Sequence, residues 1–201
     1  MTRNARYDRH IALDKAVHLF WARGYHATSM KQIEQAMDMR PGSIYATFGS
    51  KDELFSEALD AYVANGSMGL GDLLKQQDSI IDTLQDYLRN IALACYPDSA
   101  EPSRACMLVK TLLEASYTHT KIADQANTLL DGIEQSIADA LERARDQGEL
   151  NPRTDCRRLA RLIQAQIMGL RAFAQRDIDP SEVSDLAEDM AALLERYRAV
   201  H

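Results

Sequence analysis

Apolar residues recur at helical spacing along nearly the whole chain, and this periodicity restricts the possible folds more than any other feature. In residues 8–24, for example, Ala16, Val17 and Phe20 share one face at separations of three and four residues. No segment alternates apolar and polar residues in the way that a half-buried strand does. The sequence therefore predicts an all-α protein with about nine helices.

Helix-start signals divide the first part of the chain into short helices. Ser29 and Gln32 have the spacing of a capping box, which begins a helix. Ser50 and Glu53 repeat that spacing before a fourth helix, expected over residues 52–65. Pro41 suits the first position of the third helix, where its missing N–H removes no helical hydrogen bond. The second and third helices are therefore short and closely spaced.

Five longer amphipathic helices are expected in the rest of the chain. Their apolar stripes place them near residues 80–91, 107–115, 122–141, 155–175 and 181–200. We expect the chain to divide into a three-helix head, residues 1–50, and a helical body, residues 51–201.

Charge is distributed unevenly between these two parts. The 201 residues carry a formal net charge of −7, yet residues 1–51 hold eight Lys and Arg against four Asp and Glu, a net charge of +4. The remainder holds 15 basic against 26 acidic residues, a net charge of −11. A basic head on an acidic body is typical of a polyanion-binding module joined to another domain. Chance clustering of surface charge is the alternative.

Cysteine usage and hydropathy indicate a cytoplasmic protein. Cys95, Cys106 and Cys156 are odd in number and far apart, which argues against a disulfide framework. No apolar run approaches the roughly 20 residues that span a bilayer. The first ten residues lack the apolar segment of a secretory signal. We therefore expect no membrane partner.

Residues 29–47 have the arrangement of a helix-turn-helix, in which a tight turn at residues 36–40 joins two short helices. Small residues after the turn would let the second helix approach base edges in the major groove. Hydroxyl and backbone N–H groups would bind phosphates, and Arg40 would bind either a guanine or a phosphate. The expected DNA-binding residues are Thr28, Ser29, Arg40, Gly42, Ser43, Tyr45, Ala46, Thr47 and Lys51.

The stretch Ala12–Tyr62, which contains this helix-turn-helix, resembles the DNA-binding region of TetR-family transcriptional repressors. The resemblance implies an all-α homodimer whose two heads bind a pseudo-palindromic operator on double-stranded DNA, and whose body binds a small ligand that weakens this binding. The chain departs from the family at Arg40-Pro41, where many members have a small capping residue and a lysine. The matching residues are Ala16, Leu19, Phe20, Gly24, Tyr25, Thr28, Ser29, Ile33, Ala36, Gly42, Ser43, Ile44, Tyr45, Phe48, Lys51, Leu54 and Phe55.

Three arginines precede or begin the first expected helix. Arg3, Arg6 and Arg9 would either reach the adjacent minor groove and phosphates, as basic arms do, or form a solvated tail. The sequence leaves both alternatives open.

The last two expected helices each carry an apolar stripe. Two stripes from each of two subunits would form a four-helix bundle, and the family resemblance places the dimer interface there. Periodicity alone also allows packing within one subunit. Paired heads about one DNA turn (~34 Å) apart would supply affinity for a symmetric site. The expected interface residues are Leu159, Leu162, Ile163, Gln166, Ile167, Leu170, Leu186, Met190, Leu193, Leu194 and Tyr197.

The helices in the middle of the body would enclose the effector. A mostly apolar cavity with a few polar groups suits a small, largely apolar molecule. Apolar stripes of this kind usually form plain core, and that alternative stays open for each residue. The candidate lining residues are Tyr62, Tyr87, Cys106, Met107, Lys110, Tyr117, Leu130, Gln166 and Met168.

Two other functions are compatible with the sequence. Cys106, at the expected start of the sixth helix and near Lys110, would be a redox or electrophile sensor if its thiolate is favoured there, or else a small buried residue. The second of these functions is that of a helical enzyme or ligand carrier that never binds DNA. The five histidines lack metal-ligand spacing, and neither a phosphate loop nor a nucleophile elbow is present. We therefore expect no enzymatic activity, no metal and no cofactor.

Overall fold

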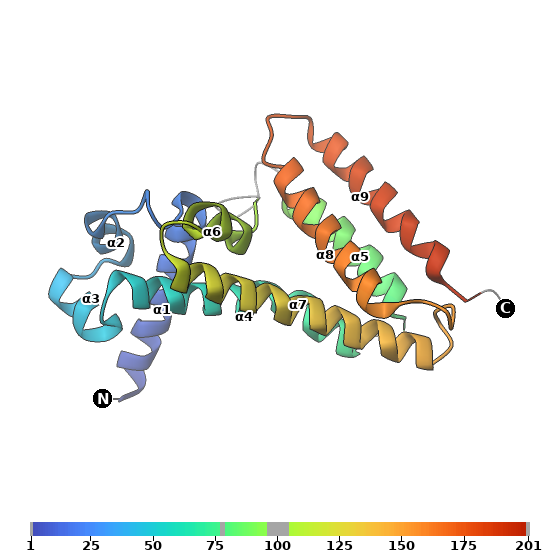
Figure 1. Cartoon of the computed structure of the whole chain (residues 1–201). Helices are drawn as coiled ribbons and strands as arrows, with labels where there is room; N and C mark the ends of the chain where they lie inside the picture. The colour runs from blue at the N-terminus through green and yellow to red at the C-terminus, as the bar shows by residue number, and fades with distance from the viewer. Residues whose placement is uncertain (1, 77–78, 96–104, 200–201) are drawn as a thin grey trace. The chain divides into compact units, whose positions relative to one another are not determined.

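The computed structural model describes residues 2–76, 79–95 and 105–199, with side chains given for all of these except residues 2–8, 65–69, 71–73, 75 and 76 (Figure 1). Within these ranges the chain forms nine α-helices, one short 3-10 helix and no strand. The helices are α1 (Thr2–Arg23), α2 (Met30–Met37), α3 (Pro41–Phe48), α4 (Lys51–Gln76), α5 (Ile80–Ala94), α6 (Met107–Ala115), α7 (Thr120–Asp146), α8 (Cys156–Phe173), α9 (Pro180–Leu194) and η1 (Glu195–Tyr197).

These helices confirm the all-α prediction, with two differences in length. α1 begins at Thr2 rather than near residue 8, because its first turns carry no apolar stripe that would mark them in the sequence. α4 continues to Gln76, beyond the expected end at residue 65. Its second half contains three glycines, which lower helix propensity, but Leu70 and Leu74 are buried there and offset that cost. No helix in the described ranges is both long and apolar enough to cross a membrane.

The chain forms two compact units. Unit 1 comprises Met1–Asn65 and Cys106–Leu129, and unit 2 comprises Gly66–Ala105 and Leu130–His201. The long helices α4 and α7 therefore contribute residues to both units. Unit 1 adds α6 and parts of these two helices to the expected head of residues 1–50. The predicted domain boundary after residue 50 stays a prediction.

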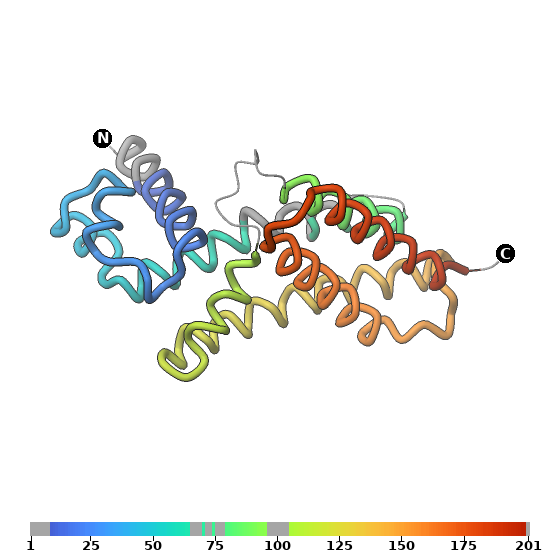
Figure 2. Tube along the Cα trace, turned by 90° about the horizontal axis from the view of Figure 1, so that it is seen from above, coloured from blue at the N-terminus to red at the C-terminus, as the bar shows by residue number. Residues whose placement is uncertain are grey.

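Aromatic side chains join α1 to α4 in unit 1. The Phe20 and Phe55 rings meet edge to face with centroids 4.8 Å apart, and Trp21 meets Tyr62 edge to face at 5.1 Å. Aromatic pairs prefer this geometry because the positive edge of one ring faces the negative face of the other. α2 packs on α1 and α3 packs on α2, as Figure 2 also shows. The two short helices are thus held on an aromatic core.

One apolar cluster forms the core of unit 2. α5 packs against α8 and α9, which lie side by side in Figures 1 and 2. The buried residues of α9, namely Val183, Ala187, Ala191 and Leu194, recur every three or four positions, so a single stripe of this helix faces the core. The opposite faces of α8 and α9 remain at the surface of the unit.

Candidate nucleic-acid interface

α2 begins with the capping box that the sequence predicts. The Ser29 backbone N–H donates to Gln32 Oε1 at 2.8 Å, and the Gln32 backbone N–H donates to Ser29 Oγ at 3.4 Å. After Met37, Asp38 adopts a left-handed conformation with a φ of 53°. This conformation turns the chain sharply and leaves only residues 38–40 between α2 and α3.

α3 has one buried and one exposed face. Ile44 and Phe48, one turn apart, are 1% and 4% exposed and anchor the helix in unit 1. Pro41 occupies its first position and Arg40 is its N-cap residue, without a capping hydrogen bond from the Arg40 side chain. The helix reads Pro-Gly-Ser-Ile-Tyr-Ala-Thr-Phe and contains no acidic residue. A small, uncharged face of this kind suits close approach to base edges.

Most of the predicted DNA-binding residues lie on the exposed side of the α2–α3 region. Tyr45 is 49% exposed, and a Cβ atom built at Gly42 would meet no atom within 4 Å. The exposed members of the predicted set are Ser29, Arg40, Gly42, Ser43, Tyr45, Ala46 and Thr47.

Thr28, also in the predicted set, is buried. Its side chain is 1% exposed, and its hydroxyl donates to the Gly24 carbonyl oxygen at 2.6 Å. Gly24 has a φ of 82°, a conformation that favours glycine, and the Thr28 bond closes this turn after α1. The hydroxyl is therefore used inside unit 1, and a phosphate contact through the backbone N–H groups at the start of α2 stays a prediction.

Lys51 is partly buried and contacts Tyr25 in two ways. Its Nζ donates to the Tyr25 carbonyl oxygen at 2.7 Å and lies 4.2 Å from the centre of the Tyr25 ring. Burial lowers the pKa of Lys51, and the charges of Asp52 and Glu114 oppose that shift. The bond to Tyr25 uses one of three ammonium N–H groups. A phosphate contact through the others stays a prediction.

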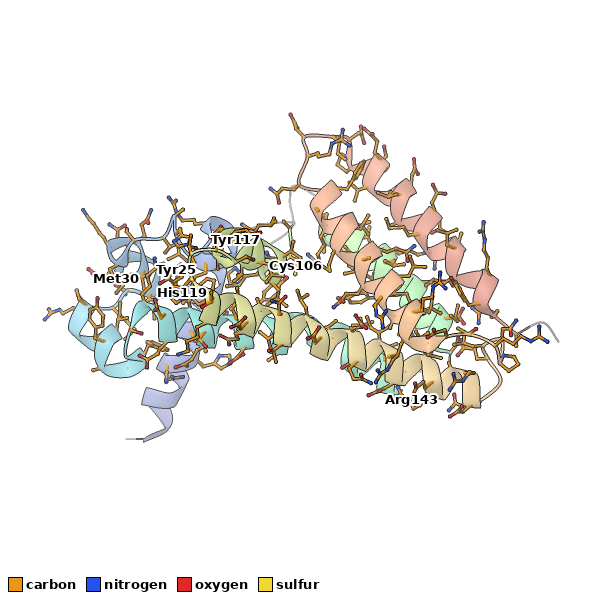
Figure 3. All side chains as sticks on the ribbon, in the orientation of Figure 1. Tyr25, Met30, Cys106, Tyr117, His119 and Arg143 are labelled. Atoms are coloured by element: carbon orange, nitrogen blue, oxygen red, sulfur yellow. The ribbon has the colours of Figure 1, made fainter. Side chains whose placement is uncertain are left out.

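A hydrogen-bonded network centred on Asp52 lies beside Lys51. The Tyr25 hydroxyl donates to one Asp52 oxygen, and His119 Nε2 lies 2.9 Å from the other. Tyr25 and His119, labelled in Figure 3, have ring centroids 5.4 Å apart. Burial and the bond to Asp52 raise the pKa of Tyr25 to about 12, and the Tyr25 bond lowers the pKa of Asp52. The sequence suggests only capping or surface charge for Asp52, because these partners are 27 and 67 residues away.

α6 contacts the end of α1 through two charged side chains. Lys110 Nζ donates to the carbonyl oxygens of Trp21 and Ala22 at 2.5 and 3.1 Å, where the C-terminus of a helix favours a cation. Glu114 Oε2 accepts the Tyr25 backbone N–H at 3.0 Å. The turn that precedes α2 is therefore held by side chains about 90 residues further along the chain.

Arg9 is engaged inside unit 1 and is not part of a free basic arm. Its Nη2 donates to both Glu57 carboxylate oxygens at 2.9 and 2.6 Å. Its guanidinium carbon also lies 4.7 Å from the centre of the Phe48 ring. The side chains of Arg3 and Arg6 lie outside the described residues.

A polar cleft of about 390 Å³ lies beside the end of α3 in unit 1. Asp52, Glu53 and Glu57 line it, but Asp52 and Glu57 are already bonded to the partners given above. The described ranges contain no group of three His, Cys, Asp or Glu side chains that could hold a metal ion. We assign no ligand to this cleft.

Sequence profiles of known families match both parts of the chain. Residues 12–58 match "Bacterial regulatory proteins, tetR family", and residues 84–193 match "Tetracyclin repressor-like, C-terminal domain". The second match alone covers more than half of the chain. The chain belongs to the TetR family. As a member, it is a transcriptional regulator with a helix-turn-helix DNA-binding region.

Relatives within the TetR family match over nearly the full length. The HTH-type transcriptional repressor ComR of Escherichia coli (strain K12) is 28% identical over 182 residues, which cover 90% of this chain and 86% of ComR. A solved structure of the TetR-family regulator CifR is 26% identical with a TM-score of 0.83, covering 94% of this chain and 95% of that one. A regulator from Cytophaga hutchinsonii, with 18% identity and a TM-score of 0.84 over 100% and 99% of the two chains, supports the TetR fold alone.

The predicted dimer residues divide into a buried and an exposed set. Four of them correct the prediction, because they belong to the unit 2 core and are at most 2% exposed: Leu159, Ile163, Leu170 and Leu194. Leu162 and Leu193 are 44% and 39% exposed. The partly exposed members are Gln166, Ile167, Leu186, Met190 and Tyr197. Any interface on these helices therefore uses the exposed side of α8 and α9.

The predicted effector residues are divided between the two units. Tyr117, labelled in Figure 3, is 99% exposed just after α6 rather than enclosed, which counts against that prediction. Lys110 bonds to α1 as described. The remaining candidates are Tyr62, Cys106 and Met107 in unit 1, and Tyr87, Leu130, Gln166 and Met168 in unit 2. Gln166 Oε1 is buried and accepts no hydrogen bond from the described part of the chain.

Proposed function

We propose that this regulator represses transcription in the cytoplasm by binding, as a homodimer, to a pseudo-palindromic operator on double-stranded DNA. A small effector bound in its body releases it, and it has no catalytic activity. The exposed face of α3 carries the proposal, because buried Ile44 and Phe48 hold Arg40, Ser43 and Tyr45 at the surface. A coupling free energy of about 1–3 kcal/mol between effector and operator would change DNA affinity 5- to 150-fold.

Named relatives support this proposal. ComR and BdcR of Escherichia coli (strain K12) are both named transcriptional repressors, and BdcR is 29% identical over 146 residues, 72% of this chain and 71% of BdcR. The CifR structure is a complex with 26-base-pair operator DNA. Double-stranded DNA is therefore the partner that the relatives favour.

We assign the exposed residues of the α2–α3 region to two kinds of contact. Arg40 reads a base edge, as its exposed guanidinium can bond two acceptors of one guanine. Tyr45 and Thr47 bind phosphates through their hydroxyls, the start of α2 at Ser29 binds another through backbone N–H groups, and Lys51 adds a charged contact. The small residues Gly42, Ser43 and Ala46 let α3 enter the major groove.

Selection of binding sites from a random duplex pool tests the proposal. We expect enrichment of an inverted repeat with half-sites about one helical turn (~34 Å), or a multiple, apart. A single enriched half-site would remove the dimer from the proposal. No affinity for any duplex at low salt would favour a helical enzyme or carrier instead.

An effector in unit 2 would explain the unsatisfied acceptor on α8. A buried acceptor without a donor costs about 1–3 kcal/mol, and Gln166 Oε1 is such an acceptor in the described structure. A ligand that is largely apolar and carries one hydrogen-bond donor would satisfy it. We therefore propose Gln166 as the polar contact, with Tyr87, Leu130 and Met168 as apolar candidates.

Cys106 supports a second candidate function, sensing of electrophiles or oxidants. It is partly exposed and is the N-cap residue of α6, one turn before the Lys110 that contacts α1. A modified thiol would thus lie on the helix that holds the turn before α2. Replacement by Cys106→Ser tests it. Loss of the response of DNA binding to hydrogen peroxide would support this function, and an unchanged response would remove it.

A further inference from the structure

A basic cleft lies in unit 2 where the start of α8 meets the end of α9. Its volume is about 640 Å³, and its lining includes Arg153, Arg158 and Arg196 beside Leu162 and Tyr197. None of the three guanidinium groups forms a hydrogen bond or ion pair with any residue that the structure describes. Unpaired guanidinium groups favour carboxylates, which accept two parallel hydrogen bonds from them.

The acidic groups near this cleft already have partners. Asp155 is the acidic residue of the lining, and it caps α8 by accepting the Arg158 backbone N–H at 3.0 Å. Glu195, on the adjoining turn, bonds to Arg198 at 2.8 Å. With three arginines against the one carboxylate of Asp155, the lining keeps a net positive charge, although the whole chain carries a net charge of −7.

At the opposite end of the same helix pair the start of α9 is acidic, while Arg171 lies in the last turn of α8. Glu182 and Asp185 lie in the first turns of α9, and both are exposed. Neither carboxylate bonds to a residue within the described ranges. Fourteen residues, about 21 Å of helix, separate Glu182 from Arg196. The α8–α9 pair thus carries a basic cleft at one end and two exposed α9 carboxylates at the other.

An exposed apolar band joins the two ends. Leu162 on α8 and Leu193 on α9, both toward the basic end, are 44% and 39% exposed, and the partly exposed Ile167 and Leu186 continue toward the acidic end. Further along α8, Gly169 is exposed, and a Cβ atom built there would meet nothing within 4 Å. Large side chains at one end and open space at the other allow a second helix pair to approach closely.

We propose that the basic cleft receives the Glu182 and Asp185 carboxylates of a second copy of this chain. A two-fold axis across the middle of the helix pair turns each pair antiparallel to its partner, so the basic end of one copy faces the acidic end of the other. Two identical sets of ion pairs form, one at each end of the apolar band. This inference rests on the homodimer of the proposed function, and it adds that charge sets the direction and partner choice of the dimer.

The apolar band favours a second copy over a small anion as the occupant of the cleft. A small anion would leave Leu162 and Leu193 exposed to water and would not use the acidic end of α9. A second copy covers the band and pairs both charged ends at once. Complementary charges of this kind contribute to partner specificity more than to affinity.

Charge exchange between two variants tests the proposal in the full-length protein. The first variant carries Arg158→Glu and Arg196→Glu, and the second carries Glu182→Arg and Asp185→Arg. All four positions are exposed, so folding is preserved, which circular dichroism checks. Sedimentation velocity measures the dimer dissociation constant of each variant and of their equimolar mixture.

We expect each variant alone to dimerise about tenfold or more weakly than the wild type, because like charges then face each other. The mixture is expected to form a heterodimer with an affinity within about threefold of the wild type. Unchanged dimerisation of either variant, or a mixture that forms no heterodimer, would overturn the proposal.

Further readouts distinguish failure of this inference from failure of the proposed function. The first readout is calorimetric titration with inorganic phosphate. If the wild type binds phosphate, the Arg158→Glu, Arg196→Glu variant does not, and dimerisation is unchanged, the cleft is a small-anion site and the proposal is overturned. Variants that dimerise and bind the selected operator as the wild type does overturn this inference alone. A wild type that stays monomeric at every concentration overturns the homodimer itself.

Discussion

Both units bury an apolar core, but they differ in what holds their surfaces in place. In unit 1, the Asp52 carboxylate and the Lys51, Lys110 and Glu114 side chains bond segments that are far apart in the sequence. Unit 2 has such bonds as well, from Gln85 and Arg89 on α5 to α9, but one continuous apolar cluster also spans α5, α8 and α9. The turn before α2 thus depends on a few directional bonds, whereas α8 and α9 are held mainly by the packed apolar cluster. Substitutions in the two units should therefore affect stability and DNA binding differently.

Truncation of a core side chain should give the largest loss in the free energy of unfolding and should distinguish the two units. Phe55→Ala in unit 1 and Leu84→Ala in unit 2 both remove side chains that are at most 1% exposed. We expect losses of about 3–5 and 2–5 kcal/mol in the free energy of unfolding. The single tryptophan, Trp21, lies in unit 1, so its fluorescence should report the Phe55→Ala loss more strongly. Equal shifts of fluorescence and circular dichroism in both variants would show one cooperative unit.

Loss of the proposed base contact should weaken operator binding and change the base preference at one position of each half-site. Arg40→Ala is expected to cost about 1–3 kcal/mol on the selected operator and to relax the preference at one base pair in each half-site. Lys31→Ala is the matched control, because it also removes one exposed positive charge from unit 1. Competition with single-base operator variants measures the effect. A uniform loss across all bases would reassign Arg40 to a phosphate.

The Asp52 network should give unit 1 a distinct response to acid. Its hydrogen bonds lower the folded-state pKa of Asp52, so the stabilisation is present above the unfolded pKa of about 4 and is lost as pH falls through the lower folded value. Asp52→Asn should cost about 1 kcal/mol at neutral pH, since this side chain is half exposed. Trp21 fluorescence in denaturant at pH 3 to 7 measures it. An equal acid response in wild type and variant would contradict the role of Asp52.

The same network predicts an opposite response to alkali. Tyr25 has its pKa raised to about 12, so its contribution is present below the unfolded value of about 10 and is lost as pH rises through 12. Tyr25→Phe should remove this alkaline loss while leaving unit 2 unaffected. If Trp21 fluorescence shows no change in the stability of wild-type unit 1 between pH 9 and 12, the role of the Tyr25 hydroxyl is contradicted.

Gln166→Leu should give the smallest effect and sharpen the assignment of the effector site. Replacing an unsatisfied buried acceptor by an apolar side chain of similar size should raise the free energy of unfolding by up to about 1 kcal/mol. The same change should lower effector affinity if the ligand donates to Gln166 Oε1. Increased stability with unchanged effector release would place the ligand elsewhere.

Local signals in the sequence predicted the helices well. The Ser29–Gln32 capping box, Pro41 at the start of α3 and Cys106 at the start of α6 all lie where the sequence places them. These features depend on neighbours within four residues, and such interactions are visible in a linear pattern. The exposed face of α3 followed from the same spacing.

Long-range contacts could not be predicted in this way. Periodicity shows that the Leu159 and Ile163 stripe is buried, but it does not show whether the covering surface is the same subunit or another, and the structure places them in the subunit core. Likewise, nothing near Asp52 in the sequence indicates its bonds to Tyr25 and His119. Lys51 has its observed partner 26 residues away, in Tyr25.

The central claim is that the exposed face of α3 is the surface that meets DNA. The most direct test compares Ser43→Glu on that face with Asn127→Glu, an equal change of charge at an exposed position of α7 in unit 1. Fluorescence anisotropy with the selected duplex measures both affinities. We predict that Ser43→Glu weakens binding about 100-fold or more, because a carboxylate then faces phosphates and base edges, while Asn127→Glu stays within about threefold of the wild type. Equal affinities of the two variants would contradict the account.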